Sequence, residues 1–461
     1  MPVAPQSAIS KSPLFRELRE SVAKETVAFA FACGGAIPVV SSPLDAADDV
    51  DGGKIRETSC LPIDLRWDSN DESALSSETK LTLPLEPKTE KNLDRLVRDM
   101  APATFGLGGR DVYDKSYRKA TKLDPDRFSS TFNPYELGII DAIAQALLPS
   151  LRHSKQTRSV KAELYKLNLY SGPSGKFKKH VDTPRSPAQF GSLVVCLPLG
   201  HRGGALEVRH NGKTVTFDWS NSSGDDRAPS IGWAAFYSDC EHEVLEVTEG
   251  HRLTLTYNLF CVRGNGQLGG NCPWLDPTHL PLYDTISSLV RDHDGWRDGG
   301  YLGYNCSHVY PHTSETKLNF LAPDNLKGAD MLMYEIFRSL GLKVTVRPVV
   351  VDFDNDDSNS EDSDTGPAVV GQKLPWEDWV GMIEDPIMDA YREWAGKGGP
   401  GYVSFKRVHW LNNFGHQEPQ LIWVAYGNEA STGISYSCCA IIAEIPPSGS
   451  RDAGEASEQA H

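Results

Sequence analysis

The chain has 461 residues, 39% of them hydrophobic and 23% charged, which is enough apolar material for about two or three packed domains and excludes a wholly disordered chain. Acidic residues outnumber basic ones by 62 to 46, so the formal net charge is −16. Binding to nucleic acid or to an anionic membrane surface needs clustered Lys and Arg, so we expect neither as a main partner.

Targeting signals are not evident in the sequence. No stretch reaches the roughly 18 to 20 apolar residues of a membrane span. The apolar segment 27–40 follows a charged, helix-like segment at 15–25 rather than a short basic leader. The nine cysteines include no C-x-x-C pair, which suits a reducing compartment. We therefore expect an intracellular protein, cytoplasmic or nuclear, whose oligomeric state the sequence leaves open.

Polar stretches divide the chain into blocks. We expect an N-terminal α/β region at 1–155 with helices that support a barrel, a barrel domain at 156–265, and a mixed α+β region at 270–446. Residues 352–366 are mostly Asp, Glu, Asn and Ser, which predicts a disordered acidic linker. Residues 447–461 are expected to form a disordered tail.

The clearest helix pattern of the first block lies at 133–148. Asn133 can cap a helix, Pro134 suits its first position, and Glu136 would complete a capping box. Apolar residues then recur at helical spacing until Pro149 stops the run, so we expect one helix over the whole range. The other elements expected in this block are a strand at 26–40 and a helix at 93–99.

The second block changes from a helical to a strand period. Short strand-like segments follow one another without helices between them. They lie at 161–170, 190–199, 205–209, 213–219, 231–237, 241–247 and 252–260. Asn211 and Gly212 form a strong hairpin signal between two of them. Such a run predicts a β-sandwich or barrel, and with the flanking helices it predicts an α+β fold.

The third block mixes both kinds of element. An amphipathic helix is expected at 329–340 and closed by Gly341, followed by a strand at 343–351. Further strands are expected at 420–427 and 435–445.

One arrangement of donor residues differs from the isolated histidines elsewhere in the chain. His180 and Asp182 end a strand-like segment two positions apart, so their side chains project to the same side. His242 lies in a later strand of the same block. Two imidazoles and one carboxylate are the facial triad that holds non-haem Fe(II) with open coordination positions.

A polar face follows the candidate triad. Arg252, Thr254, Thr256 and Asn258 alternate with apolar residues along one predicted strand, which indicates a cavity that holds something polar. A guanidinium at this position is suited to bind the far carboxylate of a co-substrate in bidentate fashion.

These motifs resemble those of the Fe(II)/2-oxoglutarate-dependent dioxygenases of the prolyl 4-hydroxylase type, and especially of a fungal subgroup of that family. The resemblance is carried by Tyr170 to Gly172, His180 to Asp182, Gly203 to Leu206, Gly232 to Ser238, Glu241 to Val244 and Gly250 to Thr254. It implies a double-stranded β-helix, or jelly roll, as the core of the fold.

The resemblance also implies an activity and its site. It implies catalytic and metal-ligand roles for His180, Asp182 and His242, and co-substrate binding by Arg252, Thr254 and Tyr170. The implied cofactors are Fe(II), 2-oxoglutarate and O2, with ascorbate as a candidate reductant. The implied reaction oxidises an aliphatic C–H bond of a substrate and releases succinate and CO2.

Several alternatives remain open at this stage. The substrate could be a free small molecule or a prolyl residue of a peptide, and the outcome could be hydroxylation or another oxidation. An inactive jelly roll used for metal binding or protein interaction is the alternative function, and a Zn(II) ion would also suit the triad. Cys240 could face the metal or be a buried packing residue, and Arg185 could steer an anionic substrate or form a surface ion pair. Asp182 argues against a halogenase, which has a small residue there, and Asn258 stands where nucleic-acid demethylases carry a second arginine.

Overall fold

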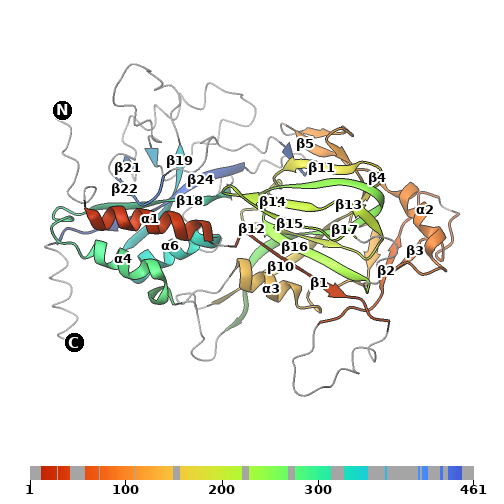
Figure 1. Ribbon diagram of the computed structural model, residues 1–461, viewed down its shortest axis with the longest axis horizontal. Helices are drawn as coiled ribbons and strands as arrows, with labels where there is room; N and C mark the ends of the chain where they lie inside the picture. Colours follow the sequence, from red (N-terminus) through yellow and green to blue (C-terminus); the bar gives the residue numbers. More distant parts are fainter. Residues whose placement is uncertain are drawn as a thin grey trace, which may run out of the picture.

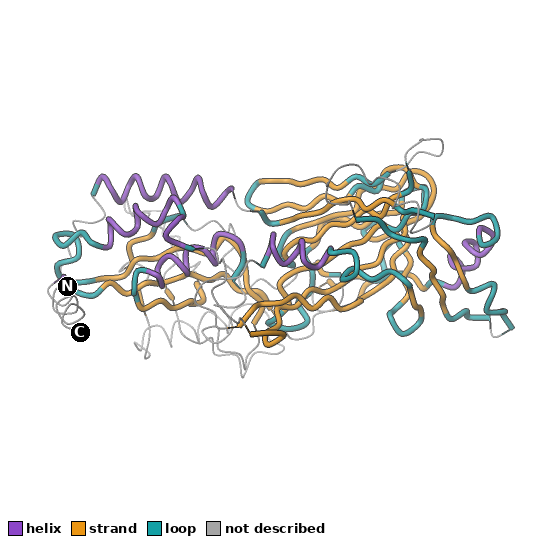
Figure 2. Tube along the Cα trace, turned by 90° about the horizontal axis from the view of Figure 1, so that it is seen from below, coloured by secondary structure: helices purple, strands orange, loops and turns teal. Residues whose placement is uncertain are grey.

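The computed structural model describes residues 12–28, 30–41, 58–71, 73–107, 110–148, 156–220, 228–267, 276–312, 326–350, 369–370, 403–404, 408–413, 426–428 and 435–448. Figures 1 and 2 show two bodies side by side along the long axis, a barrel of strands and a smaller body in which helices cover a sheet. The predicted acidic linker, and the predicted tail apart from its first two residues, lie outside the described residues.

The barrel is built from a 12-stranded sheet that folds on itself. Its strands are β1 (Ala32–Pro38), β4 (Ala101–Pro102), β7 (Arg118–Lys119), β8 (Thr121–Leu123), β10 (Gln156–Ser171), β11 (Gly175–His180), β12 (Gln189–Cys196), β13 (His201–Gly203), β14 (Leu206–His210), β15 (Lys213–Phe217), β16 (Ser230–Tyr237) and β17 (Glu241–Gln267). One wall has the order β1-β16-β12-β17-β10-β8-β4, and β11, β13 and β14 pair with β17 on the other wall. The predicted α+β class with a jelly-roll core is confirmed.

Strand β17 belongs to both walls of the barrel. Residues 241–250 pair with β11, β13 and β14, and residues 251–267 pair with β10 and β12. Gly250, at the point of passage, has a φ of 71°, and a Cβ there would lie 2.3 Å from the carbonyl oxygen of Gly200. Only glycine fits this position. The sequence predicts one strand on each side of Gly250, whereas the structure has a single continuous strand.

The predicted hairpin is confirmed. Asn211 and Gly212 connect β14 to β15 with φ angles of 47° and 74°, and the two strands pair antiparallel. Two consecutive left-handed residues are typical of the turn that matches the twist of a hairpin. The strand-like segment predicted to end at His180 and Asp182 is β11, whereas the sequence did not predict β13, a short strand on the same wall.

The best predicted helix begins later than expected. Helix α3 spans Ile139–Leu147 rather than the whole range 133–148. Asn133 and Glu136 are hydrogen-bonded at 2.8 Å, as a capping box suggests. However, Gly138 has a φ of 70°, so these residues form a separate turn before the helix starts. The prediction of a helix start at Asn133 was wrong, because a left-handed residue interrupts the helical backbone.

The rest of the N-terminal part packs around one end of the barrel. Its elements are β2 (Ile63–Trp67), β3 (Lys80–Leu83) and β9 (Phe128–Ser130) in one sheet, helix α2 (Glu90–Asp99), and β5 (Phe105–Leu107) and β6 (Arg110–Val112) in a sheet with β23 (Tyr426–Gly427). The predicted helix at 93–99 is confirmed by α2. The strand predicted at 26–40 is shorter in the structure, because its first residues belong to helix α1 (Pro13–Ala28) and only Ala32–Pro38 form strand β1.

The second body is a sheet with helices on one face. Its strands are β18 (Gly300–His312), β19 (Lys343–Val350), β20 (Val369–Val370), β21 (Val403–Ser404), β22 (Val408–Trp410) and β24 (Ser435–Ile445), and its helices are α1, η2 (Pro277–His279), α4 (Pro281–Val290) and α6 (Gly328–Ser339). The predicted elements at 329–340, 343–351 and 435–445 are confirmed. Of the strand predicted at 420–427, only Tyr426–Gly427 lies among the described residues.

Strand β24 is buried on both faces. Cys439, Ile441, Ala443 and Ile445 face the helices, where Phe15, Leu18 and Val22 of α1 join the same apolar cluster. Tyr436, Cys438, Ala440 and Ile442 face the other way and form a cluster that Val181 of the barrel joins. Apolar packing on this second face therefore connects the C-terminal sheet to the segment that follows β11.

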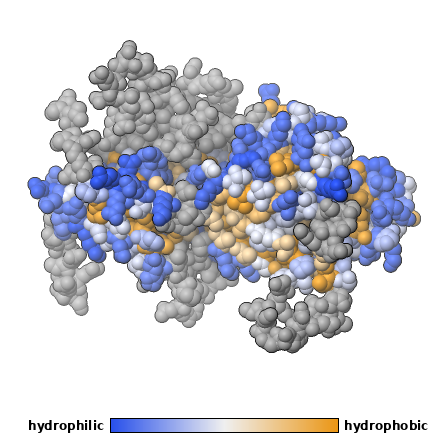
Figure 3. All heavy atoms as spheres, in the orientation of Figure 1, coloured by the Kyte–Doolittle hydropathy of each residue, from blue (hydrophilic) through white to orange (hydrophobic). Residues whose placement is uncertain are grey.

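The surface differs between the two bodies. On the face shown in Figure 3, hydrophilic residues cover α1 and the neighbouring helices, and hydrophobic residues gather over part of the barrel. Among the described residues, none of the helices combines the length and the apolar character that crossing a membrane requires.

Candidate metal centre

The candidate metal centre lies where β11 and β17 face each other. His180 ends β11, and its partner in the ladder is His242, with ring centroids 4.2 Å apart. Asp182 follows two residues later, and its Oδ1 lies 3.7 Å from Nε2 of His242. One donor atom of each residue lies within 4.8 Å of the other two, and all three residues are buried. The structure thus brings together the three ligands that the sequence predicts.

Backbone carbonyl groups orient both imidazoles. Nδ1 of His180 lies 2.8 Å from the carbonyl oxygen of Lys178, and Nδ1 of His242 lies 3.0 Å from that of Cys240. A carbonyl can only accept, so each Nδ1 carries the proton and each Nε2 keeps its lone pair. Phe177 stacks on His180 at a centroid distance of 3.5 Å. Two such nitrogens beside one carboxylate form a donor set that fits Fe(II).

Asp182 is held by side chains from distant parts of the chain. Ser192 on β12 donates a short hydrogen bond to Oδ2, and the amide of Asn428 donates one of 2.8 Å to Oδ1. The hydroxyl of Tyr436 on β24 donates to the backbone carbonyl of Asp182 at 3.0 Å. Both carboxylate oxygens are thereby oriented, one from the barrel and one from the C-terminal segment.

The protonation state of His180 suits metal binding. Burial lowers its pKa well below the ordinary value of 6.5, and the neighbouring His242 and Arg118 also lower it, against the opposing effect of the hydrogen bond to Lys178. The imidazole is therefore neutral at pH 7. Neutral imidazole is the form that coordinates a metal ion.

The triad opens into a cavity of about 560 Å³, a volume that includes open solvent at its mouth. Four polar residues of β17 line it, namely Arg252, Thr254, Thr256 and Asn258. The predicted alternation is confirmed for Leu253, Leu255 and Leu259, which are buried in the hydrophobic core of the barrel, whereas Tyr257 belongs to that core and also lines the cavity.

Arg252 is the unusual member of this row. It is only 1% exposed, yet Nε, Nη1 and Nη2 have no hydrogen-bond partner among the described residues. Its guanidinium lies 5.5 Å from the ring centroid of Tyr170 and 5.6 Å from that of Trp219. Buried charges are normally paired, so this guanidinium fits an anionic group that enters the cavity from outside the chain.

The other two predicted co-substrate residues lie beside Arg252. Tyr170 is its direct partner in the β10–β17 ladder, and both Tyr170 and Thr254 line the cavity. The hydroxyl of Thr254 donates a hydrogen bond of 3.5 Å to the carbonyl oxygen of Asn168. Because its proton is used in this bond, the hydroxyl of Thr254 can act toward a ligand as a hydrogen-bond acceptor.

Three lining residues escaped the sequence analysis. Ser192 and Asn428 hold Asp182, as described above. Arg118 is buried, donates to Oδ1 of Asn168 at 3.0 Å and lies 4.3 Å from the ring centroid of Phe177. Ser192 could have been found from its place on a strand beside the polar row of β17. Arg118 and Asn428 stand in no motif.

Two residues with open roles have definite places in the structure. Cys240 is buried in the turn between β16 and β17, and its sulfur belongs to a separate cluster with His210 and His308. The guanidinium of Arg185 lies 4.5 Å from the ring centroid of Tyr165, a residue that lines the cavity. Arg185 is thus close to the cavity wall.

Comparisons with known proteins point to the same part of the chain. Residues 165–260 match the model of the 2OG-Fe(II) oxygenase superfamily. A prolyl-4-hydroxylase from Pseudomonas putida is 21% identical and aligns over 37% of this chain and 82% of its own, with a TM-score of 0.24. A 2OG-Fe(II) oxygenase family oxidoreductase from Burkholderia pseudomallei is 14% identical over 38% and 80%, with a TM-score of 0.21.

A third solved structure is a prolyl hydroxylase from Trichoplax adhaerens in complex with a hypoxia inducible factor peptide fragment. It is 16% identical over 36% of this chain and 74% of its own, with a TM-score of 0.22. No curated protein matches the sequence significantly. The family match begins in β10 and ends in β17, so it contains all three residues of the triad and Arg252. Residues 165–260 of this chain, which form the core of the barrel, are therefore similar in sequence to the 2OG-Fe(II) oxygenase superfamily.

Proposed function

We propose that this protein is an Fe(II)- and 2-oxoglutarate-dependent dioxygenase that hydroxylates an aliphatic C–H bond of its substrate and releases succinate and CO2. Arg252 carries this proposal. Its buried guanidinium lacks a partner among the described residues, and it lines the same cavity as the triad. A dicarboxylate that reaches from a metal to an arginine would account for both features at once.

Each part of the site has a distinct task in this proposal. His180, Asp182 and His242 hold the metal through two nitrogens and one oxygen, which leaves coordination positions open. Arg252 binds the distal carboxylate of 2-oxoglutarate with its paired N–H groups. Bound Fe(II), together with O2 and 2-oxoglutarate, supplies the oxidising chemistry.

The walls of the cavity protect that chemistry from water. Tyr170 and Trp219 lie against the guanidinium of Arg252, and Phe177 and Phe236 lie against the two imidazoles. Aromatic surfaces at these places exclude water from the metal and strengthen the electrostatic attraction between Arg252 and a carboxylate. We propose a prolyl residue of a peptide or a free small molecule as the substrate, with ascorbate as the reductant that keeps the iron ferrous.

Binding tests the proposal before any substrate is known. Anaerobic addition of Fe(II) and 2-oxoglutarate should produce a weak visible metal-to-ligand charge-transfer band in the full chain. Asp182→Ala should abolish the band by loss of the metal, and Arg252→Met should abolish it by loss of 2-oxoglutarate while Fe(II) still binds. Thr278→Ala, an exposed change in η2 far along the chain, is the matched control that should keep the band.

Turnover separates an enzyme from an inactive module. The wild-type chain should convert 2-oxoglutarate to succinate in air, and a peptide or metabolite mixture should show a product heavier by one oxygen atom. A chain that binds neither Fe(II) nor 2-oxoglutarate would contradict the proposal. A chain that binds both but never forms succinate would be the metal-binding module considered from the sequence.

A further inference from the structure

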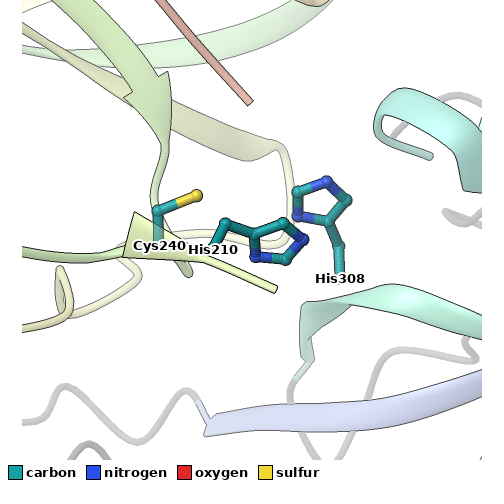
Figure 4. Close-up of side chains that lie close together, drawn as sticks. All are labelled: His210, Cys240 and His308. Atoms are coloured by element: carbon teal, nitrogen blue, oxygen red, sulfur yellow. The ribbon is translucent and has the colours of Figure 1, made fainter. Parts of the chain in front are cut away.

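A second cluster of metal-binding side chains lies outside the cavity. His210 ends β14, Cys240 lies in the turn between β16 and β17, and His308 lies on β18. One donor atom of each lies within 4.8 Å of the other two. Figure 4 shows the sulfur of Cys240 directed toward the two imidazoles, with His308 approaching from the opposite ribbon. We propose that these three residues form a Zn(II) site that joins the barrel to the C-terminal sheet.

The donor set selects the ion. Two imidazole nitrogens and one thiolate suit Zn(II), whereas Mg²⁺ and Ca²⁺ prefer oxygen ligands. Cys240 and His308 are 0% and 3% exposed, so the ion would be shielded from solvent. The thiolate is the form of Cys240 that binds zinc, so the thiol proton leaves to solvent as the Zn–S bond forms.

The outer contacts of His308 resemble those of a metal ligand. Its Nδ1 lies 3.1 Å from Oδ2 of Asp239, which is buried and held on its other oxygen by Lys327 Nζ at 2.6 Å. A carboxylate acceptor fixes the proton on Nδ1 and leaves Nε2 as the donor to a metal, the arrangement found behind many zinc-bound histidines. The Asp239–Lys327 pair is neutral overall, so the positive charge of Zn(II) would be offset mainly by the thiolate.

The two imidazoles are already neighbours but are not yet in coordination geometry. The rings of His210 and His308 stack with centroids 4.1 Å apart and planes 5° from parallel. Tetrahedral zinc with bonds of about 2.0 to 2.3 Å brings its ligand atoms within about 3.3 to 3.8 Å of one another. Binding therefore requires the rings to tilt and the donor atoms to approach by about 1 Å. His210, which is only half-buried at the end of its strand, is the residue that can move.

The position gives the ion a structural role. His210 and Cys240 belong to the barrel, and His308 belongs to the sheet that contains β24. In addition, the carbonyl group of Cys240 accepts the hydrogen bond from Nδ1 of His242. A metal on the thiol of Cys240 would fix the turn that orients one ligand of the triad, and it would hold the two bodies together.

Cobalt substitution distinguishes this site from the triad. The triad contains no sulfur, so a thiolate-to-Co(II) charge-transfer band in the near ultraviolet cannot come from the triad. Anaerobic titration of the metal-stripped, reduced full chain with Co(II) should produce this band, and one molar equivalent of Zn(II) should remove it. The band should persist in Asp182→Ala and in Cys60→Ser, which changes a different buried thiol.

Two variants test the ligands. Cys240→Ser should lose the thiolate band completely, and His308→Gln should weaken Co(II) binding while circular dichroism shows both variants folded. Absence of the band in the wild-type chain would overturn the proposal whether or not the variants fold. Persistence of the band in Cys240→Ser would overturn it too, because another thiol would then be the ligand. Failure of the dioxygenase proposal would leave this result untouched, since the band does not depend on 2-oxoglutarate.

Discussion

Asn428 donates a hydrogen bond of 2.8 Å to Oδ1 of Asp182 across 246 positions of the chain. The orientation of the amide is itself fixed, because its oxygen accepts the backbone N–H of Thr183 at 3.1 Å. The adjacent Gly427 forms a bridge with Val181, so backbone and side chain attach this C-terminal segment to the strand end that carries two of the proposed metal ligands. The segment thus takes part in shaping the metal centre.

Asn428→Ala should weaken Fe(II) binding by about 10 to 100-fold, the usual effect of removing a residue that orients a metal ligand. The measurement is anaerobic Fe(II) titration of the metal-stripped protein. Asn428→Asp should weaken binding further, because it places a second carboxylate against Asp182. Asn413→Ala removes an exposed amide bonded to Arg19 and serves as the control. Unchanged affinity in Asn428→Ala would show that the hydrogen bond does not orient the ligand.

Arg252→Met should make the ligand-free chain more stable and at the same time abolish its binding of 2-oxoglutarate. Removing a buried charge that has no hydrogen-bond partner among the described residues should raise the free energy of unfolding of the ligand-free protein by about 1 kcal/mol. In the wild type, 2-oxoglutarate at 100 times its Kd should raise the free energy of unfolding by about 2.7 kcal/mol. In the variant, 2-oxoglutarate should leave the free energy of unfolding unchanged. Urea unfolding with and without 2-oxoglutarate measures both effects. A marked loss of stability in the ligand-free variant would mean that Arg252 has a partner within the protein.

His201 should make stability fall in mild acid. Burial lowers its pKa below the ordinary value of 6.5, and Arg252 lowers it further, against the hydrogen bond to Leu199. The unfolded chain therefore binds this proton first, so the contribution of His201 is complete above pH 6.5 and is lost as the pH falls below it. For each unit by which the pH falls below 6.5, the free energy of unfolding of the wild type should decrease by up to about 1.4 kcal/mol relative to that of His201→Gln. Urea unfolding of both proteins between pH 5 and 8 gives the difference, and parallel curves would contradict the prediction.

The buried pair of Lys327 and Asp239 should be costly to break. The side chains are 1% and 2% exposed, and Nζ lies 2.6 Å from Oδ1. Lys327→Met should lower the free energy of unfolding by about 3 to 5 kcal/mol, because it leaves a carboxylate buried without its cation. Adding Asp239→Asn should restore part of the loss. The exposed pair of Lys343 and Glu444 is the comparison, and Lys343→Met should change little. Equal effects at the two pairs would show that burial does not decide the cost.

Short-range patterns predicted the chemistry of the site well. His180 and Asp182 share a side because they end a strand two positions apart, and the row from Arg252 to Asn258 faces the cavity because strands alternate. Both features depend only on local backbone geometry. The turn at Asn211 is equally local, and it was confirmed for the same reason.

What the sequence could not provide is the identity of the distant partners. Asn428 follows β23 and Tyr436 lies in β24, so they reach Asp182 from two different places outside the barrel. No motif around either residue indicates that it would hold a proposed metal ligand. Arg118 comes to the cavity by packing on Phe177, again without a motif. The start of α3 was missed for the opposite reason. The predicted hydrogen bond between Asn133 and Glu136 forms, but the left-handed Gly138 separates these residues from the helix.

The supports of Asp182 have a consequence for how the protein is assembled. Asn428 and Tyr436 stand 246 and 254 positions downstream of the ligand they hold. During synthesis on a ribosome, the barrel emerges long before either of them, so all three residues of the triad are made well before Asp182 can gain these two hydrogen bonds. A fragment cut to the jelly roll would carry the triad but lack what steadies it.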